Sequence, residues 1–259
     1  MSETLISFEP ATGEELWRGP VSNIDDEVAI ARGAWPEWAA KPVSFRTETL
    51  RRFVDRVKAE GEAFADLIAR ETGKPLWEAR TEVESVCNKV DISVKAYGER
   101  TPNRRIEGAM GLRNAVRHKP HGALAVLGPY NFPAHLPNGH IVPALIAGNS
   151  VLFKPSEKTP AVGAKLVELF HSAGVPQEVL RLVVGGPETG KALAGHEGID
   201  GLLFTGSART GLALNRQFAG QPGKMLALEM GGNNPIVVWD TADIRTAAII
   251  VVQSAFLSA

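Results

Sequence analysis

A carboxylate late in the sequence stands where an apolar run ends. The stretch LALEMGGNNP, residues 226–235, begins as a buried strand and continues through Glu229 and Met230 into a pair of glycines. An ionised carboxylate near a buried strand end costs free energy unless it is paired or used. The position of Glu229 therefore indicates a carboxylate with a chemical role, and that role requires a partner elsewhere in the chain.

The stretch FKPSE, residues 153–157, places a lysine and a glutamate at a second strand end. One interpretation is a helix start with a charged first turn. The other is a clamp on a ribose, in which Lys154 donates to a hydroxyl oxygen and Glu157 accepts from the hydroxyls. A carboxylate at the ribose 2′-hydroxyl favours NAD and repels the 2′-phosphate of NADP.

A third strand end leads through a glycine-rich turn, FTGSARTG at residues 204–211, into a helix. Backbone N–H groups at such a helix start can bind a pyrophosphate, and a glycine at 206 lets a flat ring approach the backbone. The spacing is not G-x-G-x-x-G, so the usual dinucleotide fingerprint is absent. The candidate cofactor-binding residues here are Gly206, Ser207, Ala208, Arg209, Thr210 and Gly211.

An asparagine occupies a tight, proline-bounded turn after a fourth strand. In GPYNFP, residues 128–133, the side-chain amide of Asn131 can donate to a developing oxyanion. The alternative is an asparagine that forms a hydrogen bond within its own turn. Both interpretations place Asn131 at the end of a strand, beside the other candidate residues.

The histidines and the single cysteine are expected to have structural roles. His135 and His140 are five residues apart, which does not align two side chains on a helix, and no cysteine or carboxylate cluster accompanies them. We therefore expect no metal site. Cys87 lies beside the apolar stripe of a helix, which predicts a partly buried core thiol rather than a reactive one.

These candidates lie on a pattern typical of an α/β fold. From residue 123 onward, short apolar runs alternate with helical segments, which predicts a Rossmann-like parallel sheet with helices on both faces. The expected strands are ALAVLG, SVLFK, LRLVVG, GLLFTG, MLALEM and PIVVWD. Ligands of such sheets bind at the carboxyl ends of the strands, where the candidate residues fall.

The first part of the chain is expected to start with helices. Helical spacing of apolar residues covers DDEVAIARGAWPEW, then TLRRFVDRVKAEGEAFADLIARETGKP as one stripe, then EARTEVESVCNKVDISVKAYGE. Gly73 and Pro75 supply a stop signal after the second segment. The basic, turn-rich stretch at residues 100–122 contains no aromatic residues, so it predicts an exposed loop and hairpin rather than a nucleic-acid surface.

Composition excludes several classes of protein. The net charge of −1 gives no bulk field toward nucleic acid or an anionic membrane. The N-terminus lacks the basic and apolar regions of a signal peptide, and the apolar run AAIIVVQSAFLSA is too short to span a bilayer. A single cysteine fits a reducing cytoplasm, where we expect the protein to act.

As a set, GPYNFP, GNSVLFKPSE, FTGS, LEMGGNNP and the earlier RETGKP resemble the NAD(P)-dependent aldehyde dehydrogenase superfamily. The resemblance implies that a cysteine thiolate attacks an aldehyde, that Asn131 holds the oxyanion and that Glu229 activates water against the thioester. It assigns Lys154 and Glu157 to the ribose of NAD and places Gly206 and Ser207 beside the nicotinamide. It also implies a cofactor-binding domain at residues 1–230, a hairpin near 104–122 used in homo-oligomerisation, and the start of a catalytic domain at 231–259.

Two departures from the family pattern bear on these expectations. His140 stands where many members carry a lysine. The family's nucleophilic cysteine follows the glutamate by a few dozen residues, so we expect it and most of the catalytic domain to lie beyond Ala259, with Cys87 unable to replace it. The 259 residues alone are then expected to be inactive. One alternative is a non-catalytic nucleotide-binding or subunit-interaction module. A second is an NADPH-using acyl-phosphate reductase of related fold, and Glu157 and Glu229 both argue against this second alternative.

Overall fold

The chain begins with two short antiparallel strands, contrary to the expected helical start. The computed structural model describes residues 3–256, and its first elements are β1 (Thr4–Phe8) and β2 (Glu15–Pro20). In β1 the buried position is the polar Ser7, whereas Phe8 is exposed. The alternation of apolar and polar residues that marks a half-buried strand is therefore inverted here, which hid the strand from the sequence pattern.

Four helices follow, namely α1 (Ile24–Ala40), α2 (Val43–Ala59), α3 (Gly61–Thr72) and α4 (Leu76–Arg100). The stripe expected to form one helix is split into α2 and α3 at Glu60, whose φ and ψ of −108° and 14° leave the helical region. The expected stop after α3 is confirmed, because Gly73 adopts the left-handed conformation of a C-cap (φ 77°).

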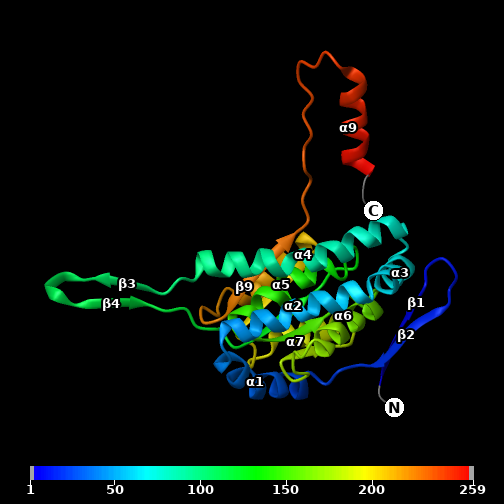
Figure 1. The fold of residues 1–259 in the computed structure, drawn as a ribbon. Coiled ribbons are helices and arrows are strands. Elements are labelled where there is room, and N and C mark those ends of the chain that lie inside the picture. Colours follow the sequence, from blue (N-terminus) through cyan, green and yellow to red (C-terminus); the bar gives the residue numbers. More distant parts are fainter. Residues whose placement is uncertain (1–2, 257–259) are drawn as a thin grey trace.

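Five parallel strands form the central sheet in the order β7-β6-β5-β8-β9. Helices surround this sheet in the body of the molecule (Figure 1). They are β5 (Ala123–Leu127), β6 (Ser150–Lys154), β7 (Leu180–Leu182), β8 (Gly201–Gly206) and β9 (Met225–Met230). The connecting helices are α5 (His135–Ala147), α6 (Pro160–Ser172), α7 (Pro187–Gly195) and α8 (Ala208–Phe218). The strand order reverses between β5 and β8, which creates the crevice where doubly wound sheets bind ligands.

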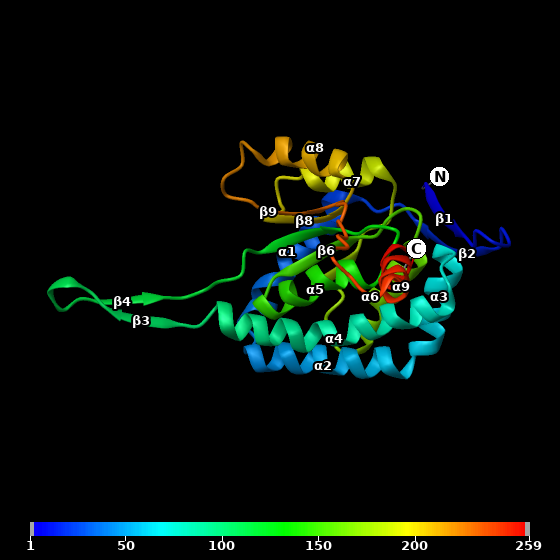
Figure 2. The ribbon, with the colours of Figure 1, turned by 90° about the horizontal axis from the view of Figure 1, so that it is seen from above.

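Helices cover both faces of this sheet, as the sequence predicted. Along β5, Leu124 and Val126 point into a core shared with α2 to α6, while Ala123 and Ala125 point into a second core with α1, α7 and α8. Figure 2 shows α7 and α8 on one side of the sheet and α2, α4 and α5 on the other. This burial on both faces explains why the strands are continuous apolar runs.

The expected hairpin projects from the body as β3 (Arg104–Glu107) and β4 (Arg113–Val116), joined by the short 3-10 turn η1 (Ala109–Gly111) (Figure 1). Every residue of the two strands is exposed, and Met110 at the tip is 98% exposed. The structure thus confirms the hairpin. Its use in homo-oligomerisation stays a prediction.

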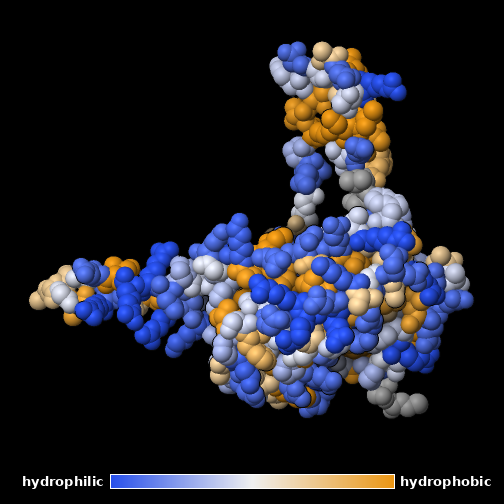
Figure 3. Space-filling view, in the orientation of Figure 1, coloured by the Kyte–Doolittle hydropathy of each residue, from blue (hydrophilic) through white to orange (hydrophobic). Residues whose placement is uncertain are grey.

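The segment after β9 differs from expectation. The run PIVVWD was predicted to be a strand, but residues 231–239 contain no helix or strand, and Val237 and Trp239 are exposed. The prediction was wrong because a strand needs a neighbour to pair with, and within residues 3–256 this segment has none. The chain then ends in α9 (Ile244–Phe256), whose apolar side chains form an exposed surface away from the body (Figure 3). The proposed boundary at residue 230 stays a prediction.

Candidate functional site

A cleft of about 910 Å³ opens at the carboxyl ends of the sheet strands. Its lining comes from the segments that follow β5, β6, β8 and β9, and from one wall formed by α4 and α5. It therefore contains the point where the strand order reverses. Among the residues predicted from the sequence, the cleft brings together Asn131, Glu157, Gly206, Ser207, Arg209, Thr210 and Glu229.

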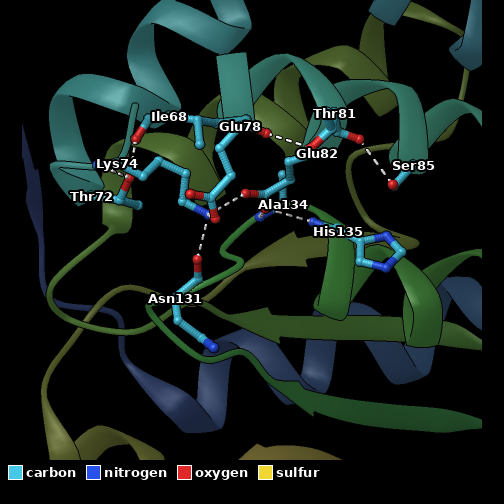
Figure 4. A network of polar contacts seen from close by, with 10 residues as sticks. All are labelled: Ile68, Thr72, Lys74, Glu78, Thr81, Glu82, Ser85, Asn131, Ala134 and His135. Carbon is cyan, nitrogen blue, oxygen red and sulfur yellow. Dashed lines mark hydrogen bonds and ion pairs between the residues drawn. The ribbon is translucent and has the colours of Figure 1, made fainter. Parts of the chain in front are cut away.

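The turn that carries Asn131 is attached to a buried lysine of the segment between α3 and α4. The Nζ atom of Lys74 donates to the backbone oxygen of Asn131 at 2.7 Å and lies 4.0 Å from the ring centroid of Phe132. The same ammonium is 3.0 Å from Glu82 and 3.6 Å from Glu78 (Figure 4). Because Lys74 is only 6% exposed, these contacts compensate for the loss of its hydration.

The second side of this network holds the start of helix α5. One carboxylate oxygen of Glu82 accepts the backbone N–H groups of Ala134 and His135, at 2.9 and 3.0 Å (Figure 4). First-turn N–H groups have no acceptor within their own helix, so a carboxylate is a favourable partner for them. Lys74 and Glu82 together fix residues 131–135 from both ends, while the Asn131 side chain stays exposed.

The expectation of a buried strand end at Glu229 was wrong. Strand β9 lies at the edge of the sheet, its apolar residues are half-buried, and Glu229 itself is exposed at the cleft. No burial penalty therefore argues for a chemical role. The observation that still favours such a role is the position of Glu229, because Asn131 and Glu229 line the same cleft from the ends of different strands.

His140 lies near Glu229 on the α5 wall of the cleft. Its Nε2 atom is 3.0 Å from the hydroxyl of Thr205, the residue that precedes Gly206 at the end of β8. Burial lowers the pKa of His140, and the nearby Glu229 carboxylate opposes that shift. Burial therefore favours the neutral form of this imidazole more than solvent favours the neutral form of an exposed histidine.

Lys154 and Glu157 lie beside a second cavity of about 580 Å³. The Lys154 ammonium donates to the backbone oxygen of Pro155 at 3.0 Å and lies 4.0 Å from Glu157. Burial lowers the pKa of Lys154, and Glu157 partly compensates. Both cavities are lined by Glu157, Arg209 and Thr210, so they form adjoining compartments.

Several residues of the turn at the start of α8 have structural roles that do not depend on a ligand. Ser207 is the N-cap, and its hydroxyl accepts the backbone N–H of Thr210 at 3.2 Å. A side chain at Gly206 would lie 2.5 Å from the ring of Phe204, and one at Gly211 would lie 2.4 Å from the sulfur of Met230. Ala208 begins the helix. The start of α8 thus faces the cleft without any bulky side chain at Gly206 or Ala208.

The structure places Cys87 away from this chemistry. It is half-buried on α4 and packs against the larger core, and burial raises the pKa of its thiol. Within residues 3–256, Cys87 is not among the residues that line the cleft. Over the same range, no group of three or more histidine, cysteine or acidic side chains is arranged to hold a metal ion.

Sequence reasoning missed Lys74, Glu82 and Lys89, of which Lys89 lines the cleft from α4. Lys74 belongs to the quoted motif RETGKP, but its partner Asn131 is 57 residues further along the chain. The motif marks a helix stop, and nothing in its composition indicates the distant contact.

Residues 1–259 match the aldehyde dehydrogenase family over their whole length. The chain belongs to the aldehyde dehydrogenase family. Among its curated relatives is the N-succinylglutamate 5-semialdehyde dehydrogenase of Sphingopyxis alaskensis, with 91% identity over 100% of this chain and 54% of that protein. The protein of the same name from Novosphingobium aromaticivorans is 62% identical over 98% of this chain and 54% of its own length. This aldehyde dehydrogenase chain thus spans about half the length of the curated relatives it matches.

Solved aldehyde dehydrogenase structures share the fold. An NAD-dependent benzaldehyde dehydrogenase from Corynebacterium glutamicum superposes with a TM-score of 0.90 at 29% identity, over 98% of this chain and 57% of that one. An NADP-dependent glyceraldehyde-3-phosphate dehydrogenase from Bacillus halodurans superposes with a TM-score of 0.88 at 29% identity, over 98% of this chain and 55% of that one. Structural neighbours of this aldehyde dehydrogenase therefore use either nicotinamide cofactor. No helix within residues 3–256 has both the length and the apolar content needed to cross a membrane.

Proposed function

We propose that this chain is part of an NAD-dependent enzyme that oxidises N-succinylglutamate 5-semialdehyde to N-succinylglutamate in arginine catabolism. The observation that carries the proposal is the 91% identity to a relative of that name, which extends over all 259 residues. The cleft supports it, because it presents an amide donor and a carboxylate to one space at the switch point of the sheet.

In this proposal, Asn131 supplies one donor to the oxygen of the aldehyde as negative charge develops there. Its side-chain amide is exposed at the cleft, while its backbone oxygen is held by the ammonium of Lys74. A donor that is positioned before the reaction loses little freedom during it, and one such donor is worth about 2.7–4 kcal/mol in an acyl-transfer site.

Glu229 is proposed as the general base that takes a proton from water when the covalent thioester is hydrolysed. Its exposure at the cleft gives water access, and the neutral His140 lies near it. General-base catalysis of this kind accelerates a reaction about 10²- to 10⁴-fold. One proton of the attacking water passes to Glu229 while the water oxygen bonds to the thioester carbon. The C–S bond then breaks and releases the cysteine thiolate, and the carboxylic acid formed loses its proton to solvent.

Lys154 and Glu157 are proposed to hold the ribose of NAD, with residues 206–211 at the pyrophosphate and nicotinamide side. The bound cofactor supplies the acceptor for the hydride that leaves the aldehyde carbon. Glu157 contributes the preference for NAD, because its carboxylate repels the phosphate that distinguishes NADP. The adjoining cavities beside Glu157 have room for both halves of the dinucleotide.

The nucleophilic thiol is proposed to belong to the part of the relatives' length that this chain does not span. Cys87 is an unfavourable nucleophile, because burial raises its pKa and its side chain packs against the core. We further propose a cytoplasmic homo-oligomer in which the exposed β3–β4 hairpin contacts another copy.

The test is a kinetic comparison in the chain extended to the full length of its relatives. We expect NAD-dependent oxidation of N-succinylglutamate 5-semialdehyde, and a fall in kcat of about 10²- to 10³-fold on Asn131→Ala. The 259-residue chain assayed in parallel is expected to form no NADH. Equal kcat values for the parent and Asn131→Ala proteins would refute the role of Asn131, and activity of the short chain that disappears in Cys87→Ser would refute the role of the thiol.

A further inference from the structure

A lysine of helix α4 contributes to the lining of the cleft. Lys89 lines the same cleft as Asn131 and Glu229 and is half-buried. Its side chain lies over Gly139 of α5, where an added Cβ would sit 3.6 Å from its Cε and 3.7 Å from its Nζ. These distances are ordinary van der Waals contacts, so the Lys89 side chain packs directly against the backbone of α5 at Gly139.

Among the residues that the structure describes, Lys89 has no carboxylate partner, in contrast to Lys95 on the same helix and Lys74 just before it. Lys74 is paired with Glu78 and Glu82, and Lys95 lies 4.0 Å from Glu99. Within residues 3–256, no carboxylate oxygen lies within 4.0 Å of the Lys89 ammonium. A partly desolvated cation without a counter-ion favours binding of an anion.

The other cations that line the cleft belong to different parts of it. Lys158 follows β6 and lies 4.9 Å from the ring centroid of Tyr130. Arg209 lies in the first turn of α8, beside the proposed cofactor-binding residues. Within residues 3–256, Lys89 is thus the one lysine or arginine that α4 and α5 contribute to the cleft lining, which on this wall also includes Leu136, Gly139 and His140.

The charge of Lys89 reaches the residues around the proposed reaction centre. Burial is the main cause of the lowered pKa of His135 and of His140, and the positive charge of Lys89 lowers both further. Lys89, His140 and Glu229 line one cleft, so an anion bound at Lys89 would share that cleft with Glu229.

We propose that Lys89 is a specificity-determining residue that binds a carboxylate of the substrate, so that the cleft selects aldehydes bearing a carboxylate a few bonds from the reacting carbon. The inference rests on the proposed function and deepens it. N-succinylglutamate 5-semialdehyde carries two carboxylates and belongs to this class, whereas a short aliphatic aldehyde offers Lys89 no charge. The selectivity comes from a charge-assisted hydrogen bond that only the anionic substrate forms.

The experiment measures kcat/KM for N-succinylglutamate 5-semialdehyde and for hexanal in the chain extended to its relatives' full length. Lys89→Met is expected to lower kcat/KM for the anionic aldehyde about tenfold to a hundredfold, mainly through KM, and to leave hexanal within about twofold. Lys89→Arg, which keeps the charge, is expected to retain most of the discrimination. Lys95→Met, on an exposed part of the same helix, is the matched control and should leave both values unchanged.

Activity with hexanal also reports that each variant folds, and Lys89→Gln replaces Lys89→Met if that protein is insoluble. Equal losses for both aldehydes, or no loss for either, would overturn the role of Lys89 while leaving the aldehyde dehydrogenase activity in place. A parent protein that oxidises hexanal but not the anionic aldehyde would overturn it too. A parent protein that oxidises neither would refute the proposed function and this inference with it.

Discussion

The two walls that present Asn131 and Glu229 to the cleft are built in opposite ways. The turn of Asn131 is fixed by ionic and hydrogen-bonding contacts to Lys74 and Glu82, both buried. Glu229 lies on the edge strand β9, is exposed, and is followed by residues 231–239 without regular structure. Contacts within residues 3–256 therefore fix the backbone position of the Asn131 turn. Fewer contacts hold Glu229, so its position can change more easily.

Substitution of Glu229 is expected to produce the largest effect, on rate alone. In the extended protein, Glu229→Gln should slow steady turnover about 10²- to 10⁴-fold, because it removes the base that activates water. NADH should still appear in a rapid burst, since hydride transfer precedes hydrolysis. Because Glu229 is exposed, the midpoint of urea unfolding should not change. Loss of the burst with normal steady turnover would contradict the assigned role.

Substitution of Lys74 is expected to affect both stability and rate. Lys74→Met leaves Glu78 and Glu82 buried without their cation, which destabilises a protein by about 3–5 kcal/mol. The change is measured by urea denaturation of the 259-residue chain, with Lys95→Met as the control at an exposed ion pair. In the extended protein, kcat should fall more than the affinity for NAD. An unfolding free energy equal to that of the control would mean that the buried ions do not hold the Asn131 wall.

The sequence predicted the central sheet but not every contact that positions the cleft residues. The strands β5, β6, β7, β8 and β9 were predicted from apolar runs, and their carboxyl ends bring the predicted residues together because parallel strands end at one edge. PIVVWD contains an apolar run like those strands, yet it is not a strand, because pairing depends on a neighbour that its own residues do not specify. The contact of Lys74 with Asn131 likewise joins segments that only the folded chain brings together.

Substitution of Glu157 is expected to have a smaller effect, on the relative affinities for NAD and NADP. Glu157→Gln removes the carboxylate that we propose to repel the phosphate of NADP, so the ratio of the two dissociation constants should approach one, a change of about tenfold or more. Isothermal titration with NAD and NADP measures it directly. The Asn131 wall should be unaffected, with an unchanged unfolding free energy. Equal or tighter binding of NADP by the parent protein would contradict the assignment of Glu157.

The smallest expected effect concerns pH. Burial lowers the pKa of His135, His140 and His171 below the value of 6.5. As the pH falls below 6.5, the unfolded chain takes up protons that the folded chain does not, so stability falls with falling pH until the lowered pKa is reached. Each histidine contributes at most about 1.4 kcal/mol per pH unit.

Urea unfolding at pH 7.5 and pH 5.5 measures this dependence. His140→Asn should reduce the difference between the two pH values, whereas His118→Gln, at an exposed loop position, should not. Burial raises the pKa of Glu71, which contributes stability that is lost as the pH rises above 4.5 and so opposes the trend. The comparison of parent and His140→Asn proteins removes that contribution, because Glu71 is common to both. An identical pH dependence in the two proteins would contradict the assignment to His140.

The carboxylate of Glu82 has a consequence for how fast single backbone protons exchange with solvent. Amides in the first turn of a helix normally exchange rapidly, because no carbonyl of that helix accepts them. Those of Ala134 and His135 are instead bonded to a buried side chain of α4. They can exchange only when α4 and α5 separate, so their deuterium uptake should follow the slow opening of the core rather than the fast fraying of a helix end. The exchange rate of these two amides, next to the turn of Asn131, thereby reports how often α4 and α5 separate.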